Sequence, residues 1–136
     1  MSTFYEEVYA IARSIPEGKV TSYGRIARML MSPRASRAVG YALKALLHKR
    51  NDPGYDDVPW QRVVNHEGYI RVGTQGEETA LQVELLRDEG VEVSLVDGRY
   101  RVAMKSHLWE GLSQQQVEAL IEPLYDDDNE EDDEDD

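Results

Sequence analysis

Apolar side chains in the first third of the chain recur every three or four residues, which is the spacing of an amphipathic helix. This pattern predicts helices over residues 3–14, 22–31 and 34–48. Ser32 and Pro33 stand where a helix cap and a first-turn proline are expected, so they are predicted to open the third helix. Two short helices joined by a tight turn are typical of a helix-turn-helix, although helical hairpins also occur in proteins that do not bind DNA.

The second half of the chain alternates apolar runs with turn residues. A helix is predicted over residues 74–89, where leucines recur at helical spacing until Gly90 ends them. Two short runs, 91–96 and 99–103, flank an Asp-Gly pair, the strongest short signal for a β-hairpin. The chain is therefore expected to have an α+β fold: a small, mostly helical domain with a winged-helix-like helix-turn-helix and a short β-hairpin.

Composition divides the chain into three segments. Residues 1–105 are expected to form one domain, and residues 106–125 an extension whose helix starts at Ser113 and is stopped by Pro123. Residues 126–136 hold ten acids and no base. Such a segment cannot bury enough apolar surface to offset the cost of ordering, so a disordered acidic tail is expected.

The net charge of −12 hides a basic first half. Residues 1–50 carry nine Lys and Arg against three acids, whereas residues 51–125 carry six against fourteen. This polarity favours a nucleic-acid face with a repelling tail, and a charge asymmetry without any partner is an equal alternative. No apolar run approaches the ~20 residues of a membrane span, and the N-terminus does not read as a signal peptide. An intracellular protein without a membrane partner is expected.

The 136 residues include no cysteine. The chain therefore has no disulfide, no thiolate metal site and no cysteine nucleophile. Its histidines, His48, His66 and His107, lack the paired spacing of metal ligands, so neither a metal nor another cofactor is expected. No coherent pair of nucleophile and base is visible, so no catalytic residue is expected.

Three motifs occur in an informative order: Val-Thr-Ser-Tyr-Gly at 20–24, Pro-Arg-Ala-Ser-Arg-Ala-Val-Gly at 33–40 and Pro-Trp-Gln-Arg-Val at 59–63. Together they resemble the DNA-binding domain of the O6-alkylguanine-DNA alkyltransferases. The resemblance implies that Trp60 stands where those enzymes carry the alkyl-accepting cysteine, and Gln61 where a histidine relays the proton. An indole cannot act as a thiolate nucleophile, and an amide cannot relay a proton as imidazole does. The chain thus resembles the alkyltransferase-like branch, and its fungal members most closely.

This resemblance implies a non-enzymatic protein that recognises O6-alkylguanine in duplex DNA by nucleotide flipping and directs it to nucleotide excision repair. Its partners would be duplex DNA containing O6-alkylguanine and nucleotide excision repair proteins. A monomer is expected, in the nucleus if the chain is fungal, which is favoured, and in the cytoplasm if it is bacterial. One alternative is a helix-turn-helix transcription regulator, for which Ala35, Ala38 and Gly40 are poor readers of a major groove. Another is an acidic interaction module in which DNA binding is incidental.

The resemblance also assigns roles to single residues, each of which would otherwise be interpreted as a packing or surface residue. Arg37 is expected to fill the gap left by the flipped nucleotide, since a planar guanidinium can stack on bases. Tyr23 would rotate the 3′ phosphate, Trp60 would form a pocket wall, and Glu89 would keep an orienting role. The lesion-pocket set is Tyr23, Trp60, Gln61, Arg62, Val63, Ile70 and Arg71. The DNA-binding set is Thr21, Ser22, Tyr23, Gly24, Arg34, Ala35, Ser36, Arg37, Ala38, Gly40 and Lys44.

Overall fold

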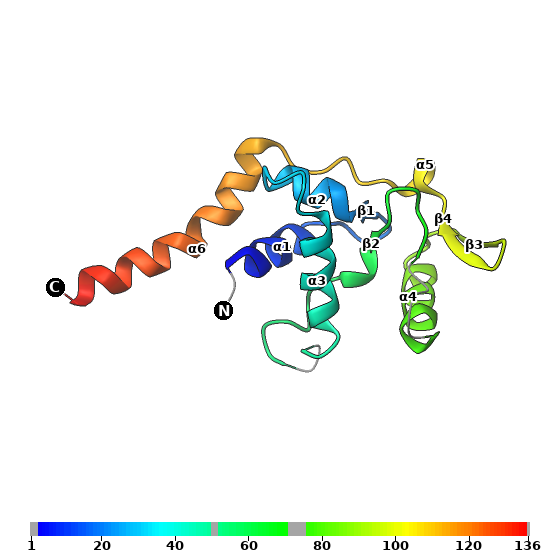
Figure 1. The fold of residues 1–136 in the computed structure, drawn as a ribbon, viewed down its shortest axis with the longest axis horizontal. Helices are drawn as coiled ribbons and strands as arrows, with labels where there is room; N and C mark the ends of the chain where they lie inside the picture. The colour runs from blue at the N-terminus through cyan, green and yellow to red at the C-terminus, as the bar shows by residue number, and fades with distance from the viewer. Residues whose placement is uncertain (1–2, 50–51, 71–75, 136) are drawn as a thin grey trace.

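Three helices in the first third of the chain pack around one apolar core. The computed structural model describes residues 3–49, 52–70 and 76–135. Helices α1 (Thr3–Arg13), α2 (Tyr23–Met29) and α3 (Ser36–Leu46) lie together at the centre of the molecule (Figure 1). Their inward-facing side chains form the first core cluster, which includes Val8, Ile11, Ala12, Ile26, Ala27, Val39, Ala42 and Leu46. The three predicted helices are therefore confirmed, because the apolar stripe of each one is buried.

Helix α3 begins later than the sequence predicts. Ser32 and Pro33 do not open it, because the N–H of Ala35 donates to the carbonyl of Ser32 at 2.8 Å and closes a turn over Pro33. Proline suits the second position of such a turn since its ring fixes φ. The prediction of a capped helix start at Ser32 was therefore wrong. The helix begins at Ser36, which places Arg37 in its first turn.

A short parallel pairing brings two distant motifs together. Strand β1 (Thr21–Ser22) pairs with β2 (Val63–Val64), with Thr21 opposite Val63. The 3₁₀ helix η1 (Trp60–Arg62) directly precedes β2, and Tyr23 directly follows β1. The pairing therefore sets the Pro-Trp-Gln-Arg-Val motif beside the first residue of α2.

Helix α4 and a β-hairpin form the second half of the fold. Helix α4 (Gly76–Asp88) is followed by β3 (Val93–Val96) and β4 (Arg99–Val102), which pair antiparallel. Asp97 and Gly98 have φ values of 51° and 79°, the left-handed conformation that a two-residue hairpin turn requires. The predicted hairpin and the α+β class are thus confirmed. A second core cluster fills this half: Val20, Val64, Ile70, Val83, Leu86, Val91, Val93 and Val102.

The C-terminal part of the chain returns to the first core. It contains α5 (Met104–His107) and α6 (Gln114–Asp135), and Trp109 and Val117 belong to the first core cluster. Residues of the segment 106–125 therefore share the core of the preceding domain. Ser113 and Gln116 cap α6 reciprocally, with hydrogen bonds of 2.8 and 3.1 Å, as the sequence predicts for the start of this helix.

Pro123 lies inside α6, so the prediction that it stops the helix was wrong. Its ring removes one backbone donor, but contacts hold the helix on both sides of it. Val117 is buried in the first core, and the Tyr125 hydroxyl is hydrogen-bonded to the Glu7 carboxylate of α1. The helix continues to Asp135, over residues for which composition predicts disorder, and no glycine or second proline falls there to end it.

Candidate nucleic-acid interface

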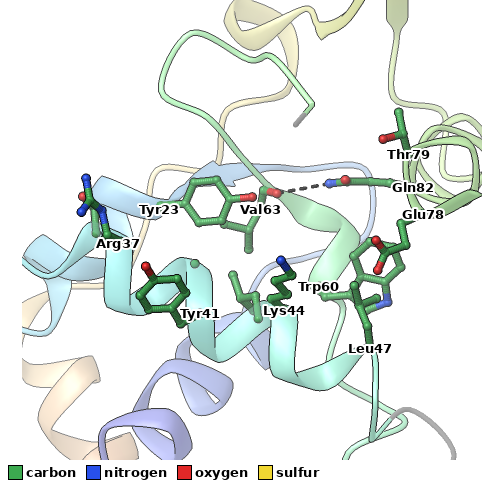
Figure 2. Close-up of a pocket in the computed structure, with 13 residues that line it drawn as sticks. Tyr23, Arg37, Tyr41, Lys44, Leu47, Trp60, Val63, Glu78, Thr79 and Gln82 are labelled. Carbon is green, nitrogen blue, oxygen red and sulfur yellow. Dashed lines mark hydrogen bonds between the residues drawn. The ribbon is translucent and has the colours of Figure 1, made fainter. Parts of the chain in front are cut away.

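A pocket of about 440 Å³ lies between α3 and α4, a volume typical of ligand sites (Figure 2). Helix α3 forms one long wall and α4 contributes the wall near Trp60, while Tyr23 and Val63 lie across from α3. The residues that line it are Tyr23, Ser36, Arg37, Gly40, Tyr41, Leu43, Lys44, Leu47, Trp60, Val63, Glu78, Thr79 and Gln82.

The structure brings together seven of the predicted site residues in this pocket: Tyr23, Ser36, Arg37, Gly40, Lys44, Trp60 and Val63. Tyr23, Trp60 and Val63 line the pocket, and Arg37 lies at the end opposite Trp60 (Figure 2). Arg37 is exposed, and within the described part of the chain its guanidinium has no hydrogen bond or ion pair. The pocket thus combines aromatic rings with a cation at its end, a combination suited to an electron-rich base.

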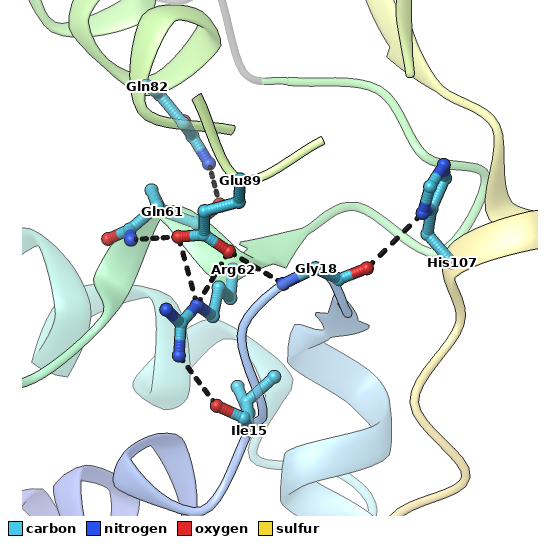
Figure 3. A network of polar contacts seen from close by, with 7 residues as sticks. All are labelled: Ile15, Gly18, Gln61, Arg62, Gln82, Glu89 and His107. Carbon is cyan, nitrogen blue, oxygen red and sulfur yellow. Dashed lines mark hydrogen bonds and ion pairs between the residues drawn. The ribbon is translucent and has the colours of Figure 1, made fainter. Parts of the chain in front are cut away.

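Gln61 and Arg62 were predicted as pocket residues, and the structure directs them elsewhere. The Gln61 Nε2 donates to the Glu89 carboxylate at 2.8 Å, and the Arg62 Nε donates to it at 2.9 Å (Figure 3). Arg62 also donates to the carbonyl of Ile15 at 2.7 Å, and the N–H of Gly18 donates to Glu89 at 2.9 Å. Neither side chain lines the pocket, because Glu89 draws both toward the turn that follows α1.

This network determines the ionisation of Glu89. Burial of the carboxyl raises its pKa, but the hydrogen bonds from Gly18, Arg62 and Gln61 outweigh burial and bring the pKa below its usual value. Glu89 is therefore a carboxylate that accepts from three N–H groups, and the Nε–H of Arg62 is shared between its two oxygens. The orienting role expected for Glu89 matches this arrangement.

Ile70 does not line the pocket, contrary to the prediction. Its side chain is fully buried in the second core cluster, and its N–H donates to the carbonyl of Tyr100 at 3.0 Å. Apolar packing against the hairpin explains this position. Arg71, the other residue predicted for this segment, lies outside the described residues.

Two residues of the predicted DNA-binding set cannot present their side chains to DNA. Thr21 and Ser22 form β1 and are buried, at 0% and 2% exposure. The Ser22 Oγ accepts the N–H of Arg25 at 3.2 Å and caps α2. Their side chains therefore start α2 and fix Tyr23, and the phosphate contacts predicted for these two residues are left to the backbone amides at the start of α2.

The other predicted DNA-binding residues remain accessible around α2 and α3. Arg34, Arg37 and Lys44 are exposed, and the smaller residues are half-buried: Gly24, Ala35, Ser36, Ala38 and Gly40. A Cβ placed on Gly24 would meet nothing within 4 Å, and one on Gly40 would lie 3.9 Å from the Tyr23 ring, an ordinary contact. The fold itself therefore does not require glycine at these two positions.

Sequence reasoning missed the pocket residues contributed by α4 and by the middle of α3. Glu78, Thr79 and Gln82 face the pocket from α4, and Gln82 also donates to the carbonyl of Val63 at 3.2 Å. Tyr41 and Leu47 complete the α3 wall with Leu43. The spacing of Glu78 and Gln82 places them on one face of the helix, which was the available signal. The part of the fold that this face packs against is set by tertiary structure, so spacing along one helix does not predict it.

The residues that the structure describes contain no group of three histidine, cysteine or acidic side chains placed to hold a metal ion. None of their helices combines the length and the apolar character needed to cross a bilayer.

Residues 3–91 match the protein family described as the 6-O-methylguanine DNA methyltransferase DNA-binding domain. The chain belongs to this family. Its fold agrees with that of Schizosaccharomyces pombe Atl1, solved in complex with damaged DNA containing O6-carboxymethylguanine. The TM-score is 0.71 with 35% sequence identity, over 81% of this chain and 97% of that one.

Within the family, the chain is similar to alkyltransferase-like proteins. It is 38% identical to alkyltransferase-like protein 1 of Schizosaccharomyces pombe over 112 residues, which cover 80% of this chain and 96% of the relative. It is 34% identical to a DNA base-flipping protein of Vibrio parahaemolyticus over 110 residues, 81% of this chain and 99% of the relative. The resemblance predicted from the three sequence motifs is confirmed.

Proposed function

We propose that this chain recognises O6-alkylguanine in duplex DNA by flipping the alkylated nucleotide into the pocket, and that it transfers no alkyl group. The observation that carries the proposal is that Tyr23, Arg37 and Trp60 all line one pocket. This pocket lies beside α3 in a chain without cysteine. The relatives named for base flipping and the relative bound to damaged DNA support it.

The geometry suggests how each residue contributes. An alkylated guanine pairs weakly, so its extrusion costs less than that of guanine. Arg37, exposed in the first turn of α3, stacks in the vacated position and donates to the orphaned cytosine. Tyr23 displaces the phosphate, and Trp60 receives the base at the far end of the pocket. With no thiolate in the chain, the lesion stays bound and intact.

The test is the affinity for matched duplexes that carry either guanine or O6-methylguanine, measured at one salt concentration. The wild type binds the lesion duplex more tightly. Arg37→Ala loses most of this preference, because it removes a stacked, charge-assisted donor that contributes about 1.5–3 kcal/mol. Arg34→Ala is the matched control: Arg34 is exposed nearby but does not line the pocket, so its loss weakens both duplexes equally. Equal affinity of the wild type for both duplexes rejects the proposal.

We also propose that the bound lesion is passed to nucleotide excision repair proteins by the protein as a monomer. A bound protein that cannot repair the base marks it for removal by other means. Purified excision repair factors should incise a duplex carrying O6-methylguanine more efficiently with wild-type protein than with Arg37→Ala. Equal incision with the two proteins contradicts the hand-off while leaving lesion recognition intact.

A further inference from the structure

Tyr41 is the one aromatic residue of α3, and the roles assigned so far do not use it. Its side chain is 58% exposed, yet it lines the pocket. Figure 2 shows its ring between Arg37 and Lys44 along the α3 wall. Within the described residues Tyr41 makes no hydrogen bond and no ring contact, so nothing in the fold accounts for an aromatic side chain here.

The spacing of residues along α3 places Tyr41 on the same side of the helix as two basic residues. Arg37, Tyr41 and Lys44 are separated by four and three residues, so they form one stripe on the surface of the helix. A single exposed aromatic residue is ordinary by itself. Tyr41, however, belongs both to this stripe, which meets the DNA when Arg37 enters the duplex, and to the wall of the pocket. Its ring lies between Arg37, which is proposed to fill the vacated stack, and Trp60, which is proposed to receive the base.

We propose that Tyr41 stacks on the flipped nucleobase at the mouth of the pocket and favours purines, whose aromatic face is larger. This inference rests on the proposed function and adds to it a residue that selects the extruded base. Every base has an aromatic face, and stacking on a protein ring is strong enough to influence affinity. More than half of Tyr41 is exposed, so its ring is open to contact with a base, and we assign the contact to the ring.

Three substitutions separate stacking from bulk and from the hydroxyl: Tyr41→Ala, Tyr41→Leu and Tyr41→Phe. Affinities and dissociation rates are measured for the guanine and O6-methylguanine duplexes, and for a duplex carrying O4-methylthymine. Tyr41→Ala and Tyr41→Leu should weaken binding to O6-methylguanine about ten-fold through faster dissociation, with a smaller loss for O4-methylthymine. Binding to the guanine duplex should change less than two-fold. Tyr41→Phe should bind like the wild type, and all variants should melt like it because the residue is exposed.

Several outcomes overturn the inference and leave lesion recognition standing. One is unchanged lesion affinity in Tyr41→Ala while Arg37→Ala loses its preference. A second is an equal loss on guanine and O6-methylguanine duplexes, which indicates a groove contact. A third is a Tyr41→Phe variant as weak as Tyr41→Ala, which indicates that the hydroxyl acts. An absence of lesion preference in the wild type instead rejects the proposed function itself, and this inference with it.

Discussion

At the scale of single residues, Trp60 and its neighbour Gln61 have separate roles. Trp60 lines the pocket, whereas Gln61 points to Glu89, which accepts its amide hydrogen at 2.8 Å. The resemblance to alkyltransferases places the acceptor cysteine at the first position and a histidine at the second. Neither Trp60 nor Gln61 supplies a thiolate or an imidazole, and Glu89 holds the second position through a hydrogen bond. The structure therefore places a carboxylate where it can orient the side chain at position 61.

Trp60→Cys alone should transfer methyl groups from O6-methylguanine slowly or undetectably. An ordinary thiol has a pKa of about 8.5 and is mostly protonated at neutral pH. Adding Gln61→His should increase transfer, because Glu89 lies in position to orient the imidazole. The measurement is the transfer of labelled methyl from DNA to protein in a single turnover. Rapid transfer by Trp60→Cys alone would show that a relay is unnecessary in this pocket.

Gly40→Ala should stabilise the protein and weaken its binding to DNA. Alanine replaces glycine inside α3, which favours the helix by about 0.5–1 kcal/mol, and its Cβ fits 3.9 Å from the Tyr23 ring. The added methyl keeps the DNA from approaching α3 closely. Thermal melting and duplex affinity are measured on the same variant, and Gly24→Ala gives a parallel case. Unchanged affinity for both duplexes would show that the helix does not need small residues to approach DNA.

At the scale of elements, Glu89 ties three parts of the fold together. It follows α4, and its carboxylate accepts hydrogen bonds from η1 and from the turn after α1. The side chains of Arg62 and Glu89 are only 17% and 10% exposed, so this ion pair is well shielded from water. Without the ion pair between Arg62 and Glu89, η1 would lose the contact that holds it in place. Trp60 belongs to η1 and forms a wall of the pocket.

The stability contributed by Glu89 should vanish in acid. Its pKa is lower in the folded protein than the ordinary value of 4.5, so the unfolded chain binds more protons as pH falls. The stabilisation is therefore complete above pH 4.5 and is lost as pH drops through the folded pKa. Glu89→Gln, which cannot ionise, should be less stable than the wild type at pH 7. Urea unfolding at several pH values should show this gap closing below pH 4.5, and a constant gap would contradict the assignment.

The elements were largely predictable because their signals are local. Apolar spacing located α1 to α3, and Asp97-Gly98 located the hairpin, whose turn needs left-handed residues. The turn at Pro33 was not predicted, because a Ser-Pro pair suits a turn as well as a helix start. The continuation of α6 past Pro123 was not predicted either, because tertiary contacts hold that helix on both sides of the proline. Pocket residues on α4 were missed for the same reason. The orientation of the Gln61 side chain was not predictable either, because it depends on a hydrogen bond to Glu89, which is distant in sequence.

At the scale of the whole molecule, charge is distributed unevenly along the chain. The first 50 residues are basic and include the arginines around α3, whereas residues 126–136 hold ten acids. Helix α6 packs along α1 and carries these acids away from the centre of the fold (Figure 1). We expect DNA near the arginines around α3 to be repelled by the acidic segment, to an extent that salt screens.

Removal of residues 126–136 should strengthen binding to an unmodified duplex. The effect should be largest at low ionic strength, where the repulsion of phosphates is least screened. The ratio of lesion to plain affinity should stay nearly constant, since the acids do not select the base. A variant with the ten acids replaced by Asn and Gln controls for chain length. Affinity that does not change at low salt would show that the acidic segment does not influence the DNA face.

The two core clusters have a consequence for how this family can diversify. The pocket lies at the seam between them: α3 belongs to the first cluster, whereas α4 belongs to the second and reaches the seam through Gln82. Tyr23 and Trp60 pack against the first cluster together with α3, whereas the α4 wall of the pocket packs in the second cluster. Substitutions in α4 should therefore reshape that one wall without repacking α3. The α3 surface and the α4 wall of the pocket can therefore change independently during evolution, although both belong to one small domain.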